Sequence, residues 1–186
     1  MKKIKYVALL RGINAGGNNI IKMNELKILF EKLNLSDVQT YIQCGNVIFN
    51  DSEKDKLELI EKIENKLYEI LDNEIKVSLL TLSEMEEIIT MKPHKYGEEN
   101  EKYKYDVIFL IEPLTAKEAM KEVQARDGVD EVYEGNKVLY FKRLKEKITK
   151  TYLTKIIGTP IYKNMTLRNW NTTGKVFELM ERNNKK

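Results

Sequence analysis

Residues that can bind anions gather in one early loop of this sequence. The stretch LLRGINAGGNN, residues 9–19, places Arg11, Asn14 and the pair Gly16-Gly17 directly after an apolar segment. Glycines at the end of a strand let a phosphate approach backbone N–H groups, and arginine recognises phosphate or carboxylate with a fork of donors. We interpret the loop as a candidate site for a small phosphorylated or carboxylated ligand. The alternative reading is a connector between a strand and a helix.

The spacing of the glycines resembles a phosphate-binding loop but lacks the chemistry of one. Gly12 and Gly17 are separated as in a P-loop, yet Asn18 and Asn19 stand where that motif needs a lysine and a serine or threonine. Without a lysine for the phosphates and a hydroxyl for Mg²⁺, nucleotide hydrolysis by that route is excluded. What remains is a loop whose backbone N–H groups can form an anion-binding nest.

Two later stretches carry polar residues at the expected ends of strands or helices. Gln43 and Asn46 flank a turn at Cys44-Gly45, and Arg168 and Asn171 precede the last helix. An arginine beside a helix N-terminus forms a locally positive site. The predicted ligand site consists of these residues together with Arg11, Asn14, Gly16 and Gly17, and we expect the three stretches to meet in space.

Each of these stretches also has a structural reading. Gly45-Asn46 is typical of a tight hairpin turn, and Asn169 or Asn171 can cap the last helix. Trp170 is expected to pack under that helix, with Phe177 and Met180, because buried tryptophan most often belongs to a core.

The rare residues limit the chemistry. Cys44 is the one cysteine and His94 the one histidine, so no disulfide within the chain and no zinc site with two histidines can form. His94 lies in the polar stretch MKPHKYGEEN and is expected on a surface loop. We predict no metal site, and the sequence identifies neither catalytic residues nor a cofactor. Whether the protein is an enzyme is left open.

The charge of the chain is mildly basic and mostly mixed. The net charge is +3, from 32 lysines and arginines against 29 acidic residues. One local excess, FKRLKEKITKTYLTK, gives an alternative function, which is weak electrostatic binding of nucleic acid. Its expected contacts are Lys142, Arg143, Lys145, Lys147 and Lys150. The signature of RNA-recognition modules, with its glycine and aromatic residues, is missing.

The elements that would position these residues occur in two similar halves. In the first half, strands are expected at 5–10, 38–43, 46–49 and 76–80, and a helix at 23–34. A second helix is expected after a cap at Ser52. Its apolar face would consist of Ile60, Ile63, Leu67 and Ile70/Leu71. In 38–43, Tyr41 and Gln43 share one face, opposite Val38 and Ile42. The order β-α-β-β-α-β is the split βαβ, or ferredoxin-like, arrangement.

The second half repeats this order. Strands are expected at 105–110, 130–134, 137–141 and 161–167, and helices at 115–123, opened by a capping box at Thr115, and 146–157. Each half is followed by an extra helix, the first opened by a capping box from Ser83 to Glu86. We therefore predict an α+β fold of two tandem ferredoxin-like modules, 1–92 and 104–186, joined by a linker at 93–103. One sheet face of each module is expected to be open.

Long motifs in this sequence resemble those of a known family. The segment LLRGINAGGNNIIKMNELKILFEKLNLSDVQTYIQCGNVIF and the later TLRNWNTTGKVFEL are similar to the bacterial proteins of domain of unknown function 1697. The resemblance implies a pair of ferredoxin-like modules and no settled activity. Cys44 stands where that family usually has serine, which argues against a nucleophilic role for it.

Three functions therefore stay open. The first is the small anionic ligand, the second is nucleic acid bound on an open sheet face or the basic run, and the third is a structural or oligomerisation module without ligand. No apolar run is long enough to span a membrane, so we expect a cytoplasmic protein without a membrane partner. The sequence does not indicate the oligomeric state.

Overall fold

The chain folds into two units, each built around its own sheet. The computed structural model describes residues 3–53 and 55–182. Unit 1 contains the chain up to Met85 and again from Val176, and unit 2 contains Glu86–Lys175. We predicted modules at 1–92 and 104–186; in this division, residues 86–92 belong to unit 2 and residues 176–182 of the last helix belong to unit 1. Within the described ranges, no helix is long and apolar enough to cross a membrane.

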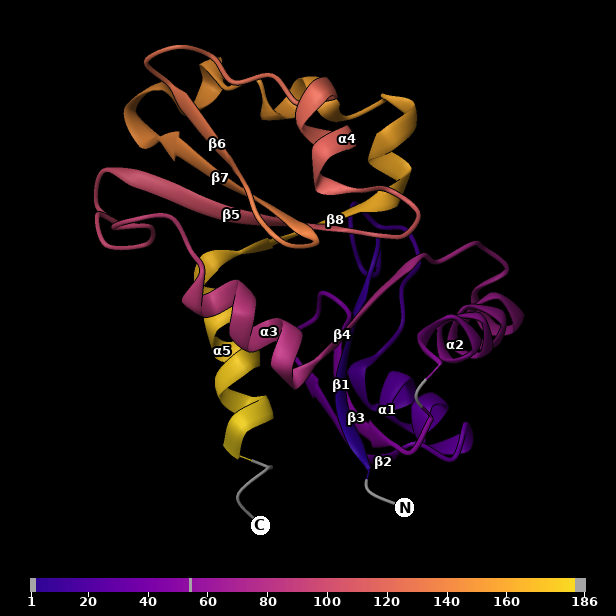
Figure 1. The fold of residues 1–186 in the computed structure, drawn as a ribbon. Coiled ribbons are helices and arrows are strands. Elements are labelled where there is room, and N and C mark those ends of the chain that lie inside the picture. The colour runs from indigo at the N-terminus through magenta and orange to yellow at the C-terminus, as the bar shows by residue number, and fades with distance from the viewer. Residues whose placement is uncertain (1–2, 54, 183–186) are drawn as a thin grey trace. The chain divides into compact units, whose positions relative to one another are not determined.

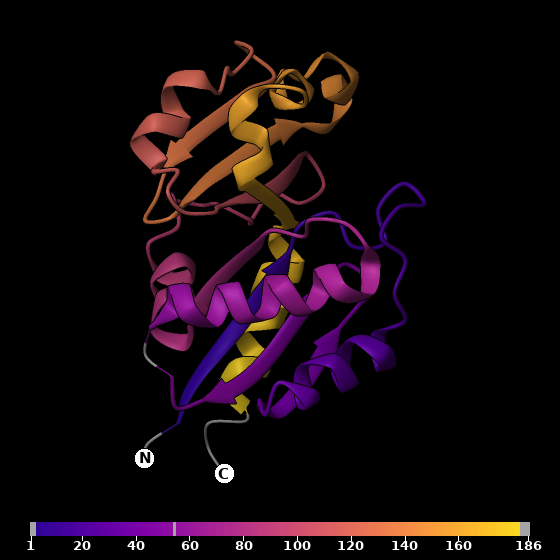
Figure 2. The ribbon, with the colours of Figure 1, turned by 90° about the vertical axis from the view of Figure 1, so that its right-hand side faces the viewer.

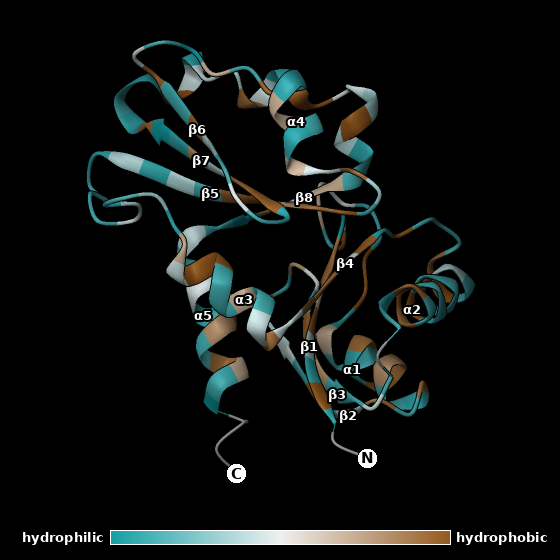
Figure 3. Ribbon diagram, viewed as in Figure 1, coloured by the Kyte–Doolittle hydropathy of each residue, from teal (hydrophilic) through white to brown (hydrophobic). Residues whose placement is uncertain are grey.

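Unit 1 contains a four-stranded antiparallel sheet in the order β2-β3-β1-β4. Its strands are β1 (Ile4–Leu10), β2 (Ser36–Tyr41), β3 (Asn46–Asp51) and β4 (Val77–Thr81). β1 and β4 are coloured mainly as hydrophobic in Figure 3. Runs of this kind are typical of strands that are buried on both faces.

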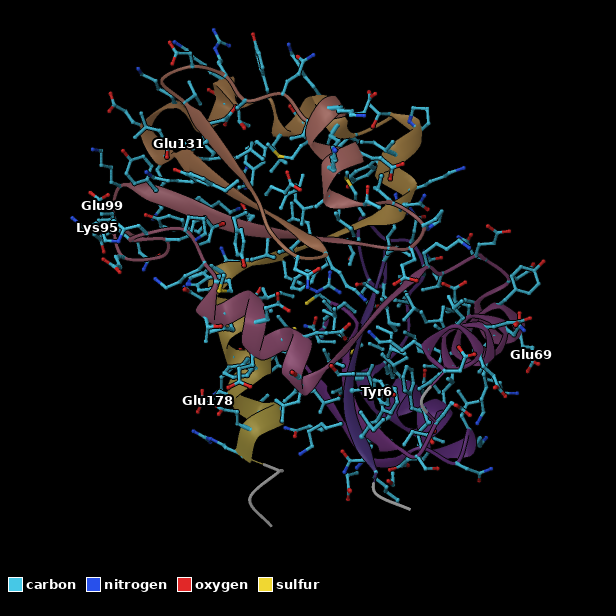
Figure 4. The ribbon with its side chains drawn as sticks, viewed as in Figure 1. Tyr6, Glu69, Lys95, Glu99, Glu131 and Glu178 are labelled. Atoms are coloured by element: carbon cyan, nitrogen blue, oxygen red, sulfur yellow. The ribbon has the colours of Figure 1, made fainter. Side chains whose placement is uncertain are left out.

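Two helices cover one face of this sheet, α1 (Met23–Lys32) and α2 (Lys56–Leu71). Leu26, Leu29 and Phe30 of α1 are buried in a core that also contains Tyr6 of β1 (labelled in Figure 4). The predicted apolar face of α2 was partly wrong. Its buried residues are Leu59, Ile63 and Leu67, while Ile70 is 54% exposed.

The other face of the first sheet is not open, contrary to our expectation. Val7 and Leu9 of β1 are buried, and Nζ of Lys5 donates to the backbone oxygen of Met180 at 3.0 Å. Met180 belongs to the final helix, α5 (Trp170–Arg182), whose yellow end lies behind the sheet in Figure 2. The extra helix therefore covers apolar residues that a single layer of helices would leave in water.

Unit 2 contains a second four-stranded antiparallel sheet, in the order β6-β7-β5-β8. Its strands are β5 (Tyr103–Leu110), β6 (Asp130–Glu134), β7 (Val138–Leu144) and β8 (Met165–Asn169). The closing strand lies later than the predicted 161–167. The two sheets have the same order, which is consistent with two tandem ferredoxin-like modules.

The helices of unit 2 match the prediction in one place and depart from it in another. α4 (Ala116–Glu122) begins with the predicted capping box, in which Thr115 and Glu118 bond to each other's backbone N–H. The α-helix predicted at 146–157 was wrong. Three short 3₁₀ helices occupy this region, η1 (Lys145–Lys150), η2 (Leu153–Ile156) and η3 (Pro160–Asn164). They cover the same sheet face as α4, since Leu153, Ile156 and Ala119 share one core.

A buried carboxylate explains why the predicted helix breaks. Asp130 of β6 accepts hydrogen bonds from Oγ1 of Thr151 at 2.7 Å and from the backbone N–H of Tyr152 at 2.8 Å. A backbone N–H that donates to a side chain cannot also form the i→i−4 hydrogen bond of an α-helix. The chain therefore leaves the helical path between η1 and η2.

Aromatic side chains cover the opposite face of the second sheet. The Tyr96 ring lies 4.8 Å from that of Tyr105, 5.3 Å from Tyr140 and 5.3 Å from Trp170. A Cβ on Gly97 would lie 2.3 Å from Nε1 of Trp170. Trp170, which we expected under the last helix with Phe177 and Met180, thus packs against the segment at 96–97. This segment covers the part of the sheet around Tyr105 and Tyr140.

Two helix starts also differ from the predicted residues. Asp55, rather than Ser52, caps α2 by accepting from the N–H groups of Leu57 and Glu58. At α3 (Leu82–Thr90), the reciprocal bonds join Thr81 and Glu84 rather than Ser83 and Glu86. Several Ser, Thr and Asp residues precede each helix, so sequence spacing alone does not identify the cap.

Candidate functional site

The Gly/Asn loop of unit 1 is a small hairpin that starts where β1 ends. The N–H of Asn18 donates to the oxygen of Ala15 at 3.1 Å, and the residues between them have positive φ values, +59° at Gly16 and +81° at Gly17. Two successive left-handed residues define a tight hairpin turn and explain the need for both glycines. Successive backbone N–H groups can form an anion nest in a turn as well as in an αR-αL pair, so the anion-binding role of Gly16-Gly17 stays a prediction.

The asparagines of the loop hold it in shape. The Asn14 side chain donates to the backbone oxygen of Ile21 at 3.0 Å and accepts from its N–H at 2.8 Å. Asn19 donates to the oxygen of Gly12 at 3.1 Å. The amides therefore replace the backbone pairing that an irregular loop cannot make for itself.

The turn between β2 and β3 packs against the start of the same loop. The N–H of Leu10 donates to the oxygen of Gly45 at 2.8 Å, and a Cβ on Gly45 would lie 2.8 Å from that of Leu10. Asn46 is buried and donates to the oxygen of Tyr41 and to Sγ of Cys44, each at 3.0 Å. The close approach at Gly45 brings two stretches far apart in the sequence to one end of the sheet.

The predicted alternation of faces in this region ends early. β2 stops at Tyr41, and Ile42 has φ +47° and is 47% exposed. Ile42 therefore does not share the buried face of Val38. Left-handed backbone is rare for a β-branched residue, and it turns the chain so that Gln43 is exposed beside the loop.

These two stretches line a surface hollow of about 370 Å³. Its walls combine polar and apolar groups, namely Asn14, Gly17, Ile20, Ile21, Lys22, Met23 and Gln43. The structure thus brings together three of the predicted ligand residues, Asn14, Gly17 and Gln43. Lys22 is the one charged side chain among the described residues of this lining.

The sequence prediction missed the apolar wall of the hollow. Ile20 and Ile21 lie between the loop and α1, and Met23 is the first residue of α1. Ile20 is 71% exposed. An isoleucine pair just before a helix is a weak signal, since such residues most often pack into the core. The exposed Ile20 could be recognised only from the structure.

A second hollow in unit 1 is lined by acidic side chains, which the described lining of the first hollow lacks. It measures about 330 Å³ and is lined by Glu64, Asn65, Tyr68, Glu74, Ile75 and Lys76. One carboxylate, Glu64, accepts from the N–H of Val77 at 2.9 Å and lies 3.5 Å from Nζ of Lys76. Carboxylates repel an anion, so the first hollow is the better candidate.

The predicted arginines do not line the first hollow. Arg11 is partly exposed at the start of the loop, and its N–H donates to the oxygen of Lys76 at 2.9 Å. Arg168 belongs to unit 2 and is 7% exposed, and its Nη1 donates to Oγ1 of Thr166 and the oxygen of Leu167, both at 2.9 Å. Asn171, also in unit 2, is exposed and donates its N–H to Oδ1 of Asn169 at 3.0 Å. Asn169 is therefore the helix cap.

The predicted nucleic-acid contacts fall into two groups. Lys145, Lys147 and Lys150 are exposed. Arg143 is instead buried and forms an ion pair with Asp106, while Nζ of Lys142 lies 2.9 Å from Glu131 (labelled in Figure 4). The first group can meet a phosphate without first losing a partner, and the second cannot.

The buried tyrosines of unit 2 are titratable groups with altered pKa. Burial raises the pKa of Tyr140 to about 12, and its hydroxyl donates to the oxygen of Ile88 at 2.7 Å. Burial likewise raises the pKa of Tyr96, whose hydroxyl lies 2.8 Å from the oxygen of Asp106. Both hydroxyls stay protonated at neutral pH and serve as donors to the backbone.

The structure offers little for metal or thiol chemistry. Within residues 3–53 and 55–182, no group of three His, Cys, Asp or Glu side chains is arranged to hold a metal ion. His94 is exposed in the loop before β5, as predicted. The Cys44 sulfur is partly buried and accepts a hydrogen bond within its own turn.

Comparisons with known proteins agree with the fold. A solved structure, the conserved bacterial protein SP0830 from Streptococcus pneumoniae, is 26% identical, with a TM-score of 0.85 over 96% of this chain and 99% of that one. No curated protein matches the sequence. The family model described as a protein of unknown function (DUF1697) matches residues 3–140, which include the loop and the hollow. The chain therefore belongs to the DUF1697 family.

Proposed function

We propose that unit 1 binds a small molecule that combines an anionic group with an apolar part. One observation carries this proposal: two loops distant in the sequence line a single hollow of about 370 Å³ with an amine, two amides and three apolar side chains. Small-molecule sites are usually concave and mainly apolar, with a few polar groups that fix orientation.

Each side chain of the hollow has a distinct role in this proposal. Lys22 supplies the positive charge for a phosphate or carboxylate. Gln43 offers both a donor and an acceptor, and Ile20 and Met23 form the wall for the apolar part. Asn14 maintains the shape of the loop, and Arg11 lies at its start without lining the hollow.

The proposal concerns binding, and we assign no reaction. The described lining contains no carboxylate, thiol or imidazole, which are the groups that most often transfer protons or attack substrates. A ligand held by Lys22 and Gln43 would be recognised by charge and shape.

Thermal unfolding in the presence of mononucleotides, sugar phosphates and aromatic carboxylates tests the proposal. A compound at a hundred times its Kd should stabilise the protein by about 2.7 kcal/mol, which raises the Tm by roughly 5–10 °C for a chain of this size. Lys22→Met should abolish the shift, because it keeps most of the length of the side chain and removes its charge. Gln43→Leu should reduce the shift.

Lys62→Met is the matched control, since Lys62 is exposed on α2 and does not line the hollow. It should leave the shift intact. A shift that persists in Lys22→Met, or that Arg11→Ala alone abolishes, would move the site away from the hollow. No shift with any compound would favour a structural role without ligand.

A further inference from the structure

A group of cations in unit 2 surrounds one tyrosine ring. Nζ of Lys155 lies 3.3 Å from the centroid of the Tyr152 ring, and Cζ of Arg126 lies 5.4 Å from the same point. Nη1 of Arg126 also donates to the backbone oxygen of Lys150 at 3.3 Å. Each cation gains from the ring, but the two positive charges repel each other.

The backbone under this group is fixed by the buried carboxylate that breaks the predicted helix. Asp130 is 6% exposed, and its Oδ2 accepts from the N–H of Arg126 at 3.0 Å and from that of Tyr152 at 2.8 Å. The loop before β6 and the segment between η1 and η2 are therefore tied to one residue. The backbone at Arg126 and Tyr152 is therefore held in place before any partner arrives, which lowers the entropy cost of binding.

The positive surface continues along the three 3₁₀ helices, which appear in orange to gold beside α4 in Figure 1. The exposed lysines there are Lys145, Lys147, Lys150, Lys155 and Lys163. Residues 145–164 include a single carboxylate, Glu146, and Asp127 follows Arg126. Within the described part of the chain, neither these lysines nor Arg126 form an ion pair, whereas Lys56, for example, pairs with Glu84.

We propose that this surface, centred on Arg126, Tyr152 and Lys155, binds the sugar–phosphate backbone of single-stranded nucleic acid. Cations spread along residues 145–163 complement a chain of phosphates better than a single phosphate group. Tyrosine and the guanidinium plane of arginine are surfaces on which unpaired bases stack. A base that stacks on this face of Tyr152 would displace the Lys155 amine, which is exposed. The contacts are to backbone and base faces, so binding is independent of sequence. No residue of this surface lines the hollow, whose lining residues all belong to unit 1.

Fluorescence anisotropy of the full chain with a labelled oligo(dT), measured over a series of NaCl concentrations, tests the inference. If six cations each neutralise one phosphate, log affinity should fall against log salt with a slope of about −4. The triple variant R126Q/K150Q/K155Q should make that slope shallower by about 2 and weaken binding at low salt at least tenfold. Tyr152→Leu should weaken binding at least about fivefold through lost stacking.

The matched control is K32Q/K62Q/K104Q, which removes the same charge from exposed lysines of α1, α2 and β5. It should keep the slope of the wild type. A control that weakens binding as much as the triple variant would overturn the inference, because net charge alone would then explain it. Lys155→Gln alone should reduce the slope by about 0.7, and it keeps the test valid if the triple variant unfolds.

A second arm distinguishes nucleic acid from a lipid surface. Phosphatidylserine vesicles present the same phosphate chemistry in a plane, and we expect weaker binding to them than to the oligonucleotide at equal salt. Tight vesicle binding that the triple variant abolishes, together with no oligonucleotide binding, would refute the inference in favour of a membrane surface.

Discussion

Asp106 and Arg143 form a buried ion pair inside unit 2, and removing either charge alone should destabilise that unit. Asp106 is 1% exposed, and the Arg143 side chain, which is 10% exposed, donates from Nη2 to its carboxylate. Water cannot replace the lost partner at such a depth, so a single substitution leaves a buried charge uncompensated. We expect Asp106→Leu and Arg143→Met each to lower the free energy of unfolding by about 3–5 kcal/mol.

The double variant Asp106→Leu/Arg143→Met should lose much less than either single variant. Two apolar side chains of similar volume remove both desolvation costs, and such exchanges are neutral or stabilising by about 1–4 kcal/mol. The structure favours this result, because Nε of Arg143 has no hydrogen-bond partner among the described residues. Burial of this guanidinium is therefore only partly compensated.

Urea unfolding followed by tryptophan fluorescence measures these free energies. Trp170 is the one tryptophan, and its ring packs against Tyr96 within unit 2, so the signal reports the unit that carries the pair. Equal m-values are required for the comparison. Glu112→Gln is the control, because it breaks the more exposed contact with Lys137 at 3.4 Å and should cost less than about 1 kcal/mol. A double variant that loses the sum of the two single losses would refute the reasoning, since it would show no coupling.

Three further predictions follow from single residues. Burial raises the pKa of Tyr140 to about 12, whereas a tyrosine in the unfolded chain loses its proton near pH 10. The free energy of unfolding should therefore be highest below pH 10 and fall by about 1.4 kcal/mol per pH unit between pH 10 and pH 12. Tyr140→Phe should flatten that fall in urea titrations across this interval, and an unchanged slope would contradict the assignment. Gly97→Ala should destabilise unit 2 by at least about 2 kcal/mol, because φ is +86° and a Cβ would meet Trp170; an unchanged Tm would contradict this. Cys44→Ser should change stability by less than about 1 kcal/mol, because a hydroxyl can also accept from Asn46; loss of folding would contradict it.

The strands were the part of the fold that the sequence predicted best. The segment 130–134 is β6 (Asp130–Glu134), and 105–110 lies within β5 (Tyr103–Leu110). Short apolar or alternating runs carry this information locally, since a strand shows its burial in consecutive residues. Each sheet also has a face that we expected to be open. Local patterns did not predict that these faces are covered, because the residues that cover them are far away in the sequence.

Helix prediction failed where a distant side chain competes for the backbone. The segment 146–157 has helical periodicity, but the carboxylate of Asp130 takes the N–H of Tyr152 and the hydroxyl of Thr151. No property of the segment itself indicates that a residue in β6 will form these bonds. Helix starts were misplaced by two or three residues for a related reason, since Ser52 and Asp55 are both good caps and only packing selects between them.

Hydrogen bonding separates the structural residues of unit 1 from those that remain available for a ligand. Asn14 and Asn46 have the residue types that a polar site needs, yet their amides bond to nearby atoms of the chain. The side chains of Lys22 and Gln43 make no hydrogen bond within the described residues, and both line the hollow. Buried polar groups must be satisfied internally, while exposed ones can exchange water for a ligand. Asn14 variants therefore test the folding of the loop, and Lys22 and Gln43 variants test the binding that we propose.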